Sequence, residues 1–133
     1  MNGIIELDAL LKNMHPHLSG REYVFCTIPS SDIDYITSLD PICTFKEDEG
    51  LTVVLEKESA LKAKLQFNAV FKKITLKVHS SLEAVGLTAA VSMALANKGI
   101  SANVIAAYYH DHIFVPCGKS DIALNVLKSL SQK

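Results

Sequence analysis

"FKKITLKVHSSLEAVGLTAAVSMALANKGISANVIAAYYHDHIFVP" spans Phe71 to Pro116 and decides the fold of this chain. A strand with one buried face is expected over Val70 to Val78, because Ile74, Leu76 and Val78 alternate with Lys73, Thr75 and Lys77. A helix is expected over about Ser81 to Asn97. Two further strands are expected, over Ala102 to Tyr109 and His112 to Pro116, with a tight turn between them. The stretch therefore predicts a strand, a helix and a hairpin in that order.

The helix in this stretch has a start signal and a stop signal. Ser80 and Glu83 form a capping box, in which each side chain can satisfy an unpaired amide of the first turn. Lys98 and Gly99 mark the end, because a cation and a glycine suit the last carbonyl groups. Between these signals the helix is apolar nearly all round, which predicts burial on more than one side. Gly86 then lies one turn inside the helix, either for close approach of a ligand or for tight packing on the sheet.

The remaining elements follow from the same kinds of pattern. The strand over Ala102 to Tyr109 has few polar breaks, so we expect it to be central in its sheet. Ser120 is expected to cap a last helix. Before Phe71 the patterns predict, in order, a short helix from Leu7 to Met14, a strand at 21–29, a segment with at most one helical turn at 30–41, a hairpin at 42–57 and a short helix at 58–65.

An internal repeat connects the two halves of the chain. When residues 45–65 are placed over residues 107–127, strand, turn, strand and helix fall on one another, with few identities. The repeat predicts two βαββαβ-like units in tandem, at 1–68 and 69–133. The first has lost most of its first helix, and the second lacks its closing strand. Units this small bury too little surface alone, so they should pack on each other or on a second chain.

Composition limits the functional classes that remain. The chain has 133 residues, 49% hydrophobic and 20% charged, with a net charge of −1. No basic surplus points to nucleic acid, and no run of membrane-spanning length or signal peptide is present. We therefore expect a cytoplasmic protein that binds neither nucleic acid nor membranes. The three cysteines have no metal-site spacing and are expected to be buried thiols.

The stretch from Phe71 to Pro116 resembles the ACT domain, the ferredoxin-like βαββαβ module of amino-acid-responsive regulators. The whole chain more narrowly resembles small bacterial ACT proteins related to the CASTOR-type amino-acid sensors. The resemblance implies an α+β fold of two tandem ferredoxin-like units with antiparallel sheets, the first unit degenerate. It also implies a regulatory role without catalysis or cofactor, and a homo-oligomer, most simply a dimer.

ACT domains bind an amino acid between the loop after the first strand and the second strand of a neighbouring unit. The resemblance places that site here, at a unit or protomer interface, on the residues His79, Ser80, Ser81, Leu82, Gly86, Asn103 and Val104. The usual Arg-Pro-Gly turn of the family is absent, and His79 to Leu82 replace it. Independently, helix N-terminal amides suit a carboxylate, and an asparagine can pair with both a carboxylate and an α-amino group. Without the resemblance, Ser80 would merely cap a helix and Asn103 merely end a loop.

Two other functions remain open at this point. An ACT-type module without a ligand would serve only to pair chains through its sheet. A small metal-dependent enzyme would use His110 and His112, which share a face if they lie on one strand. No nucleophile or phosphate-loop motif supports catalysis otherwise.

Overall fold

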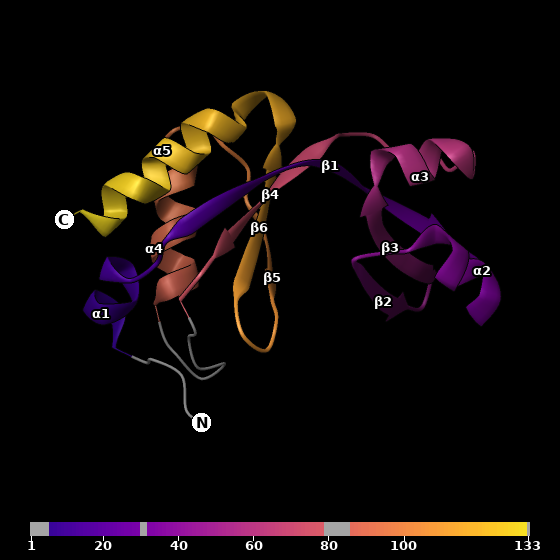
Figure 1. The fold of residues 1–133 in the computed structure, drawn as a ribbon, viewed down its shortest axis with the longest axis horizontal. Helices are drawn as coiled ribbons and strands as arrows, with labels where there is room; N and C mark the ends of the chain where they lie inside the picture. The colour runs from indigo at the N-terminus through magenta and orange to yellow at the C-terminus, as the bar shows by residue number, and fades with distance from the viewer. Residues whose placement is uncertain (1–5, 30–31, 79–85, 133) are drawn as a thin grey trace. The chain divides into compact units, whose positions relative to one another are not determined.

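The computed structural model describes residues 6–29, 32–78 and 86–132 (Figure 1). Its elements, in chain order, are α1 (Leu7–Lys12), β1 (Pro16–Ile28), α2 (Ile33–Leu39), β2 (Cys43–Glu47), β3 (Gly50–Glu56), α3 (Lys57–Lys62), β4 (Phe71–Leu76), α4 (Leu87–Ala96), β5 (Asn103–Ala106), β6 (Asp111–Pro116), a 3₁₀ turn (Cys117–Lys119) and α5 (Ser120–Ser131). None of the helices in these described ranges has the length and hydropathy needed to span a bilayer.

The elements form two compact units that do not follow chain order. Unit 1 consists of residues 1–20 and 72–133, and unit 2 of residues 21–71. The 13-residue strand β1 contributes to both, its first five residues to unit 1 and the rest to unit 2. The predicted boundary between residues 68 and 69 follows the repeat along the chain. The units defined by packing differ from it, because residues 1–20 belong with residues 72–133.

The sheet of unit 1 has the strand order β1-β4-β6-β5. The sequence pattern of the second half ends without a closing strand. In the structure, the beginning of β1 takes that position in the sheet, next to β4. β5 and β6 pair antiparallel, with Asn103 opposite Phe114 and Ala106 opposite Asp111. The prediction that the strand after α4 is central was wrong: β5 has four residues and is the last strand in the order. The apolar residues that suggested a central strand continue past β5 into the loop, where Tyr108 and Tyr109 are exposed.

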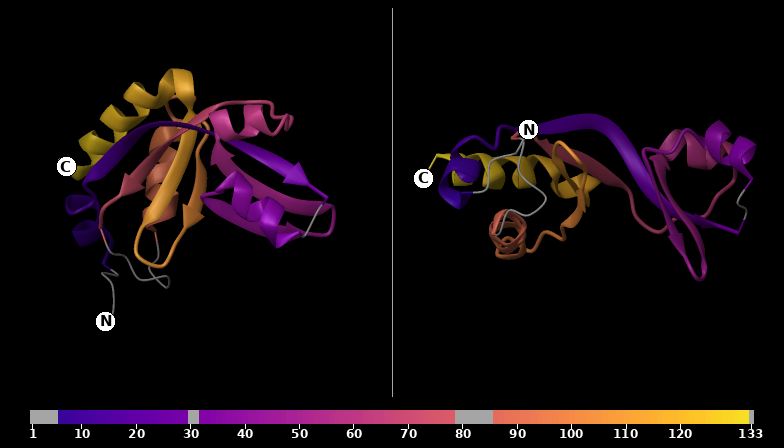
Figure 2. Two further views of the ribbon diagram at one scale, coloured as in Figure 1. Left: turned by 45° about the vertical axis from the view of Figure 1, so that its right-hand side comes forward. Right: turned by 90° about the horizontal axis from the view of Figure 1, so that it is seen from below.

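The core of unit 1 lies between this sheet and the three helices α1, α4 and α5, which are seen from two further directions in Figure 2. Its buried side chains are Leu10, Met14, Ile74, Leu76, Val78, Leu87, Val91, Leu95, Ile100, Ile113, Val115, Ala123 and Leu127. The predicted alternation of β4 is confirmed for the core face, which carries Ile74, Leu76 and Val78. Thr75 on the opposite face is also buried, so β4 is covered there as well.

Two predicted helix starts were wrong. α4 begins at Leu87 and is preceded by Gly86 as its N-cap, so Gly86 does not lie inside the helix. The Ser80–Glu83 capping box falls outside the described residues. Ser120 is the first residue of α5 and does not cap it, because a 3₁₀ turn precedes the helix and Lys119 is the N-cap. The Ser120 hydroxyl instead donates to the carbonyl of Cys117 at 3.0 Å.

Unit 2 repeats the same plan with shorter helices. Its strand order is β2-β3-β1, with antiparallel pairing throughout. α2 and α3 cover one face, and the core there contains Val24, Cys26, Ile28, Leu39, Val53, Leu55 and Ala60. α2 has seven residues, more than the single turn expected, because the Asp32 carboxylate caps it by accepting from the Asp34 amide at 2.9 Å. The hairpin and the short third helix of this half are confirmed.

Candidate functional site

The predicted binding site includes a loop between β4 and α4, and part of this loop lies outside the described residues. His79, Ser80, Ser81 and Leu82 belong to that part. The described neighbours of the loop are Val78 on one side and Gly86 on the other. Geometry at the predicted site therefore comes from these neighbours and from Asn103 and Val104.

Gly86 holds a backbone conformation that other residues rarely adopt. Its φ of +101° lies in the region that L side chains avoid, and a Cβ at this position would lie 3.3 Å from Leu7 Cδ2. The carbonyl of Gly86 accepts the first helical hydrogen bond, from the Ala90 amide at 2.8 Å. As the N-cap it offers no side-chain acceptor to the amides of the first turn of α4.

Asn103 begins β5, and its side chain is already partly engaged. Its Nδ2 donates to the backbone carbonyl of Phe114 at 3.3 Å, across the β5–β6 pair. The residue is exposed, so the amide oxygen is left to accept from a donor in solution. Val104 is half-buried and packs against the core of unit 1.

The structure brings the apolar surroundings of the predicted site into one cluster. Val78, two residues after β4, and Leu87 at the start of α4 are both buried in the core of unit 1, and Val104 packs against that same core. The two ends of the loop between β4 and α4, and the start of β5, therefore pack in one apolar cluster.

Among the described residues, no third metal ligand lies close to His110 and His112. The imidazole rings of His110 and His112 have centroids 6.5 Å apart. Nδ1 of His112 is 2.9 Å from the Thr75 hydroxyl on the neighbouring strand. Within residues 6–29, 32–78 and 86–132, no three histidine, cysteine or acidic side chains come close enough to hold a metal ion.

His112 lies in a positively charged part of the sheet. Burial lowers its pKa below the usual 6.5, and the nearby charges of Lys73, His110 and Lys77 lower it further. A depressed pKa disfavours the charged form, so the ring is kept as the neutral partner of Thr75. Sequence reasoning found this histidine but not Thr75, because the pair forms only when β4 and β6 are neighbours.

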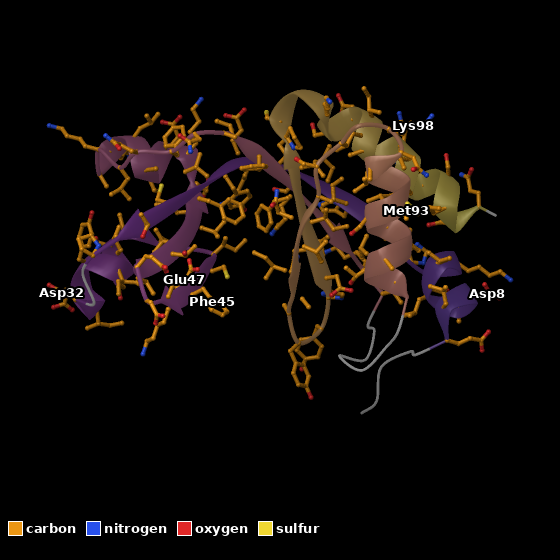
Figure 3. All side chains as sticks on the ribbon, turned by 180° about the vertical axis from the view of Figure 1, so that it is seen from behind. Asp8, Asp32, Phe45, Glu47, Met93 and Lys98 are labelled. Atoms are coloured by element: carbon orange, nitrogen blue, oxygen red, sulfur yellow. The ribbon has the colours of Figure 1, made fainter. Side chains whose placement is uncertain are left out.

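A groove between α4 and α5 was also missed from the sequence. It is lined by Ala90, Met93, Ala94, Asn97, Lys98, Ile122, Asn125, Val126, Ser129 and Leu130. Met93 and Ile122 are 63% and 54% exposed. Met93 and Lys98 can be located on and just after α4 in Figure 3. Only one side of α4 is buried in this chain, through Leu87, Val91 and Leu95, so the prediction of burial on several sides is not met within one chain.

Both halves of the chain match models of a single domain family. The ACT domain matches residues 2–72 and, in a second model, residues 71–129. The chain belongs to the ACT-domain family. The predicted fold, two tandem ACT units with ferredoxin-like antiparallel sheets, is confirmed. The narrower resemblance to CASTOR-type sensors stays a prediction.

Solved structures similar to this ACT protein extend the comparison. A Vibrio cholerae protein of unknown function, described as a possible transport protein, is 55% identical, with a TM-score of 0.86 over 95% of this chain and 96% of that one. A protein from Agrobacterium tumefaciens is 13% identical, with a TM-score of 0.71 over 87% of each chain. The regulatory subunit of aspartate kinase from Thermus thermophilus, in a ligand-free form, is 11% identical, with a TM-score of 0.58 over 86% of this chain and 95% of that one. The last two similarities concern the fold alone. No curated protein matches the sequence.

Proposed function

We propose that this chain is a non-catalytic regulatory ACT module that binds a small amino acid, or a related metabolite, at the N-terminus of α4. The observation that carries the proposal is the pair of ACT matches covering residues 2–129. The similarity in fold to an aspartate kinase regulatory subunit supports a regulatory role. The glycine N-cap of α4 supports the position of the ligand, because it leaves the first-turn amides to an outside acceptor.

Each end of an amino acid has a chemical counterpart in this proposal. The amides of the first turn of α4 and the positive end of its dipole suit the α-carboxylate. The Asn103 amide oxygen suits the α-ammonium group, because its amide nitrogen is occupied by the Phe114 carbonyl. The hydroxyls of Ser80 and Ser81 would add donors, and His79 and Leu82 would complete the loop around the ligand. Val104 contributes the apolar floor next to Val78 and Leu87.

Regulation would follow from a shift between arrangements of the module. A ligand that binds one arrangement more tightly moves the population toward it by its differential affinity. We propose a homodimer as the assembly that responds. The edge strand β5 supports this proposal, because Asn103 begins it and an edge strand can pair with a second sheet.

A thermal-shift screen against the twenty amino acids tests the proposal. An amino acid present at one hundred times its dissociation constant adds about 2.7 kcal/mol of stability. For a chain of this size that raises Tm by roughly 5–10 °C. Asn103→Ala should reduce the shift given by the same amino acid, and without ligand it should lower stability by only about 0.5–1.5 kcal/mol, through the lost hydrogen bond to Phe114. Asn68→Ala, an exposed asparagine in unit 2, is the matched control and should keep the full shift. No shift with any amino acid at millimolar concentration would count against the proposal.

The α4–α5 groove favours a second candidate, a module that assembles without a ligand. Met93 and Ile122 expose large apolar side chains on neighbouring helices, and assembly would bury them. Size-exclusion chromatography with light scattering separates the two functions. A dimer whose mass and Tm are indifferent to every amino acid supports the ligand-free module. A dimer whose stability responds to one or two amino acids supports the sensor.

A further inference from the structure

A second pocket of unit 1 is lined by basic side chains. This surface pocket of about 470 Å³, open to solvent, is lined by Lys12, His15, Pro16, His17, Lys77, Lys128, Ser131 and Gln132. They come from the end of α1, the start of β1, the residue after β4 and the end of α5. α1 contacts α5, which brings the ends of the chain's first and last helices to the same place (Figure 1). The volume is in the range of small-molecule sites.

The charge in this pocket is of one sign. Three lysines and two histidines line it, and no aspartate or glutamate of the described residues does. Two ion pairs, Arg21–Glu56 and Lys57–Glu22, lie in unit 2 and involve none of the residues of this pocket. Like charges gathered without an acidic partner repel one another, and a bound anion would relieve that repulsion.

Helix-end chemistry explains only part of this cluster. Lys12 and Lys128 lie in the last turns of α1 and α5, where a cation offsets the helix dipole. Lys77, His15 and His17 are not on helices and have no such role. His15 also holds φ at +44°, a left-handed conformation that is uncommon for a non-glycine residue.

We propose that this pocket binds a small, multiply charged anion of the phosphate class, such as the phosphate groups of a phosphorylated metabolite. Several ammonium groups match an anion that carries several charges, and lysine commonly binds phosphate as a point charge. The histidine ring nitrogens and the Gln132 amide add hydrogen-bond donors. A free amino acid fits poorly, because its α-ammonium group would meet cations and no carboxylate of the residues that the structure describes. The site is thus chemically different from the one proposed at α4.

Calorimetric titration of the full chain with inorganic triphosphate tests the proposal. We expect saturable binding that weakens between roughly 0.02 and 0.2 M salt, since the contacts are electrostatic and exposed. Lys77→Ala/Lys128→Ala should weaken binding by about tenfold. Lys62→Ala/Lys98→Ala removes the same charge from exposed positions elsewhere and should weaken it by less than about twofold. Backbone amide shifts on addition of triphosphate should concentrate at residues 12–17 and 128–132.

Three results would overturn the proposal. The first is the absence of saturable triphosphate binding at low salt. The second is an equal loss of affinity in both double variants, which would mean that only the overall charge attracts the anion. The third is citrate binding as tightly as triphosphate, which would exclude selectivity for phosphate. Lys77→Gln/Lys128→Gln repeats the test with longer side chains, and unfolding midpoints verify that each variant is folded. An amino acid that shifts Tm in a chain without triphosphate binding would leave the α4 proposal standing alone.

Discussion

Replacing Gly86 with alanine tests whether the backbone before α4 is held as the structure describes. The residue has a φ of +101°, and a Cβ added to it would lie 3.3 Å from Leu7 Cδ2. A side chain in such a conformation costs about 1–3 kcal/mol. The contact adds little, because the end of a leucine side chain can move. We therefore expect Gly86→Ala to lower the free energy of unfolding by about 1–3 kcal/mol, and Tm by roughly 3–10 °C.

Urea unfolding followed by circular dichroism measures this change, and two further variants isolate its cause. Gly118→Ala is the matched control, because a Cβ there meets nothing within 4 Å and φ is not positive. It should leave stability unchanged or raise it slightly by reducing the entropy of the unfolded chain. Leu7→Ala/Gly86→Ala removes the contact but not the strained φ, so it should not recover the loss caused at Gly86. A Gly86→Ala protein within about 0.5 kcal/mol of the parent would refute the reasoning.

Two other predictions concern the core and the neutral histidine. Leu95→Ala leaves a cavity at a fully buried position of α4, so it should lower the free energy of urea unfolding by about 2–5 kcal/mol. Ile122→Ala, at an exposed position of α5, should change that free energy by less than about 0.5 kcal/mol. Equal losses in the two variants would contradict the assigned core. Because the pKa of His112 is lower in the folded state, its contribution to stability is present above pH 6.5 and is lost as pH falls below that value toward the folded pKa. His112→Gln should therefore lose less stability between neutral and acidic pH than the parent does, and an NMR titration of Lys73→Met should show a higher pKa for His112.

The sequence was most informative where one local pattern determined one element. Alternation predicted β4, and local patterns also predicted the hairpin at 42–57 and the last helix of the chain, which the structure shows as β2–β3 and α5. Each of these patterns is decided within a few residues and by one face of the element. The repeat of strand, turn, strand and helix also held, because it is made of such local units.

The errors came from features that depend on distant parts of the chain. Ile105 and its neighbours suggested a central strand, yet strand order depends on which strands pair, and an apolar run does not encode that. Gly86 was expected inside the helix, because neither its positive φ nor its position next to Leu7 can be read from the local sequence. The basic pocket joins side chains of residues 12–17 with those of residues 77 and 128, so no spacing in the sequence could reveal it.

The grouping of residues 1–20 with residues 72–133 leads to a last prediction, on a fragment cut at the linear boundary. A fragment of residues 69–133 lacks Leu10 and Met14, both fully buried in the core of unit 1. Burying each such side chain contributes about 1.5–3 kcal/mol, and small domains have only about 5–15 kcal/mol in total. The fragment also loses the β1 residues that border β4, which leaves a strand edge unpaired. We expect it to show no cooperative unfolding transition.

A permuted chain provides the control for this prediction, because α1 contacts α5. Joining residues 6–20 through a flexible linker to the end of residues 69–133 restores Leu10, Met14 and the start of β1 without adding unit 2. This chain should unfold cooperatively in urea, although the plain fragment does not. If the plain fragment unfolds with the same midpoint as the permuted chain, the first twenty residues are dispensable for unit 1. The division by chain order at residues 68 and 69 would then describe the folding units better than the division by packing does.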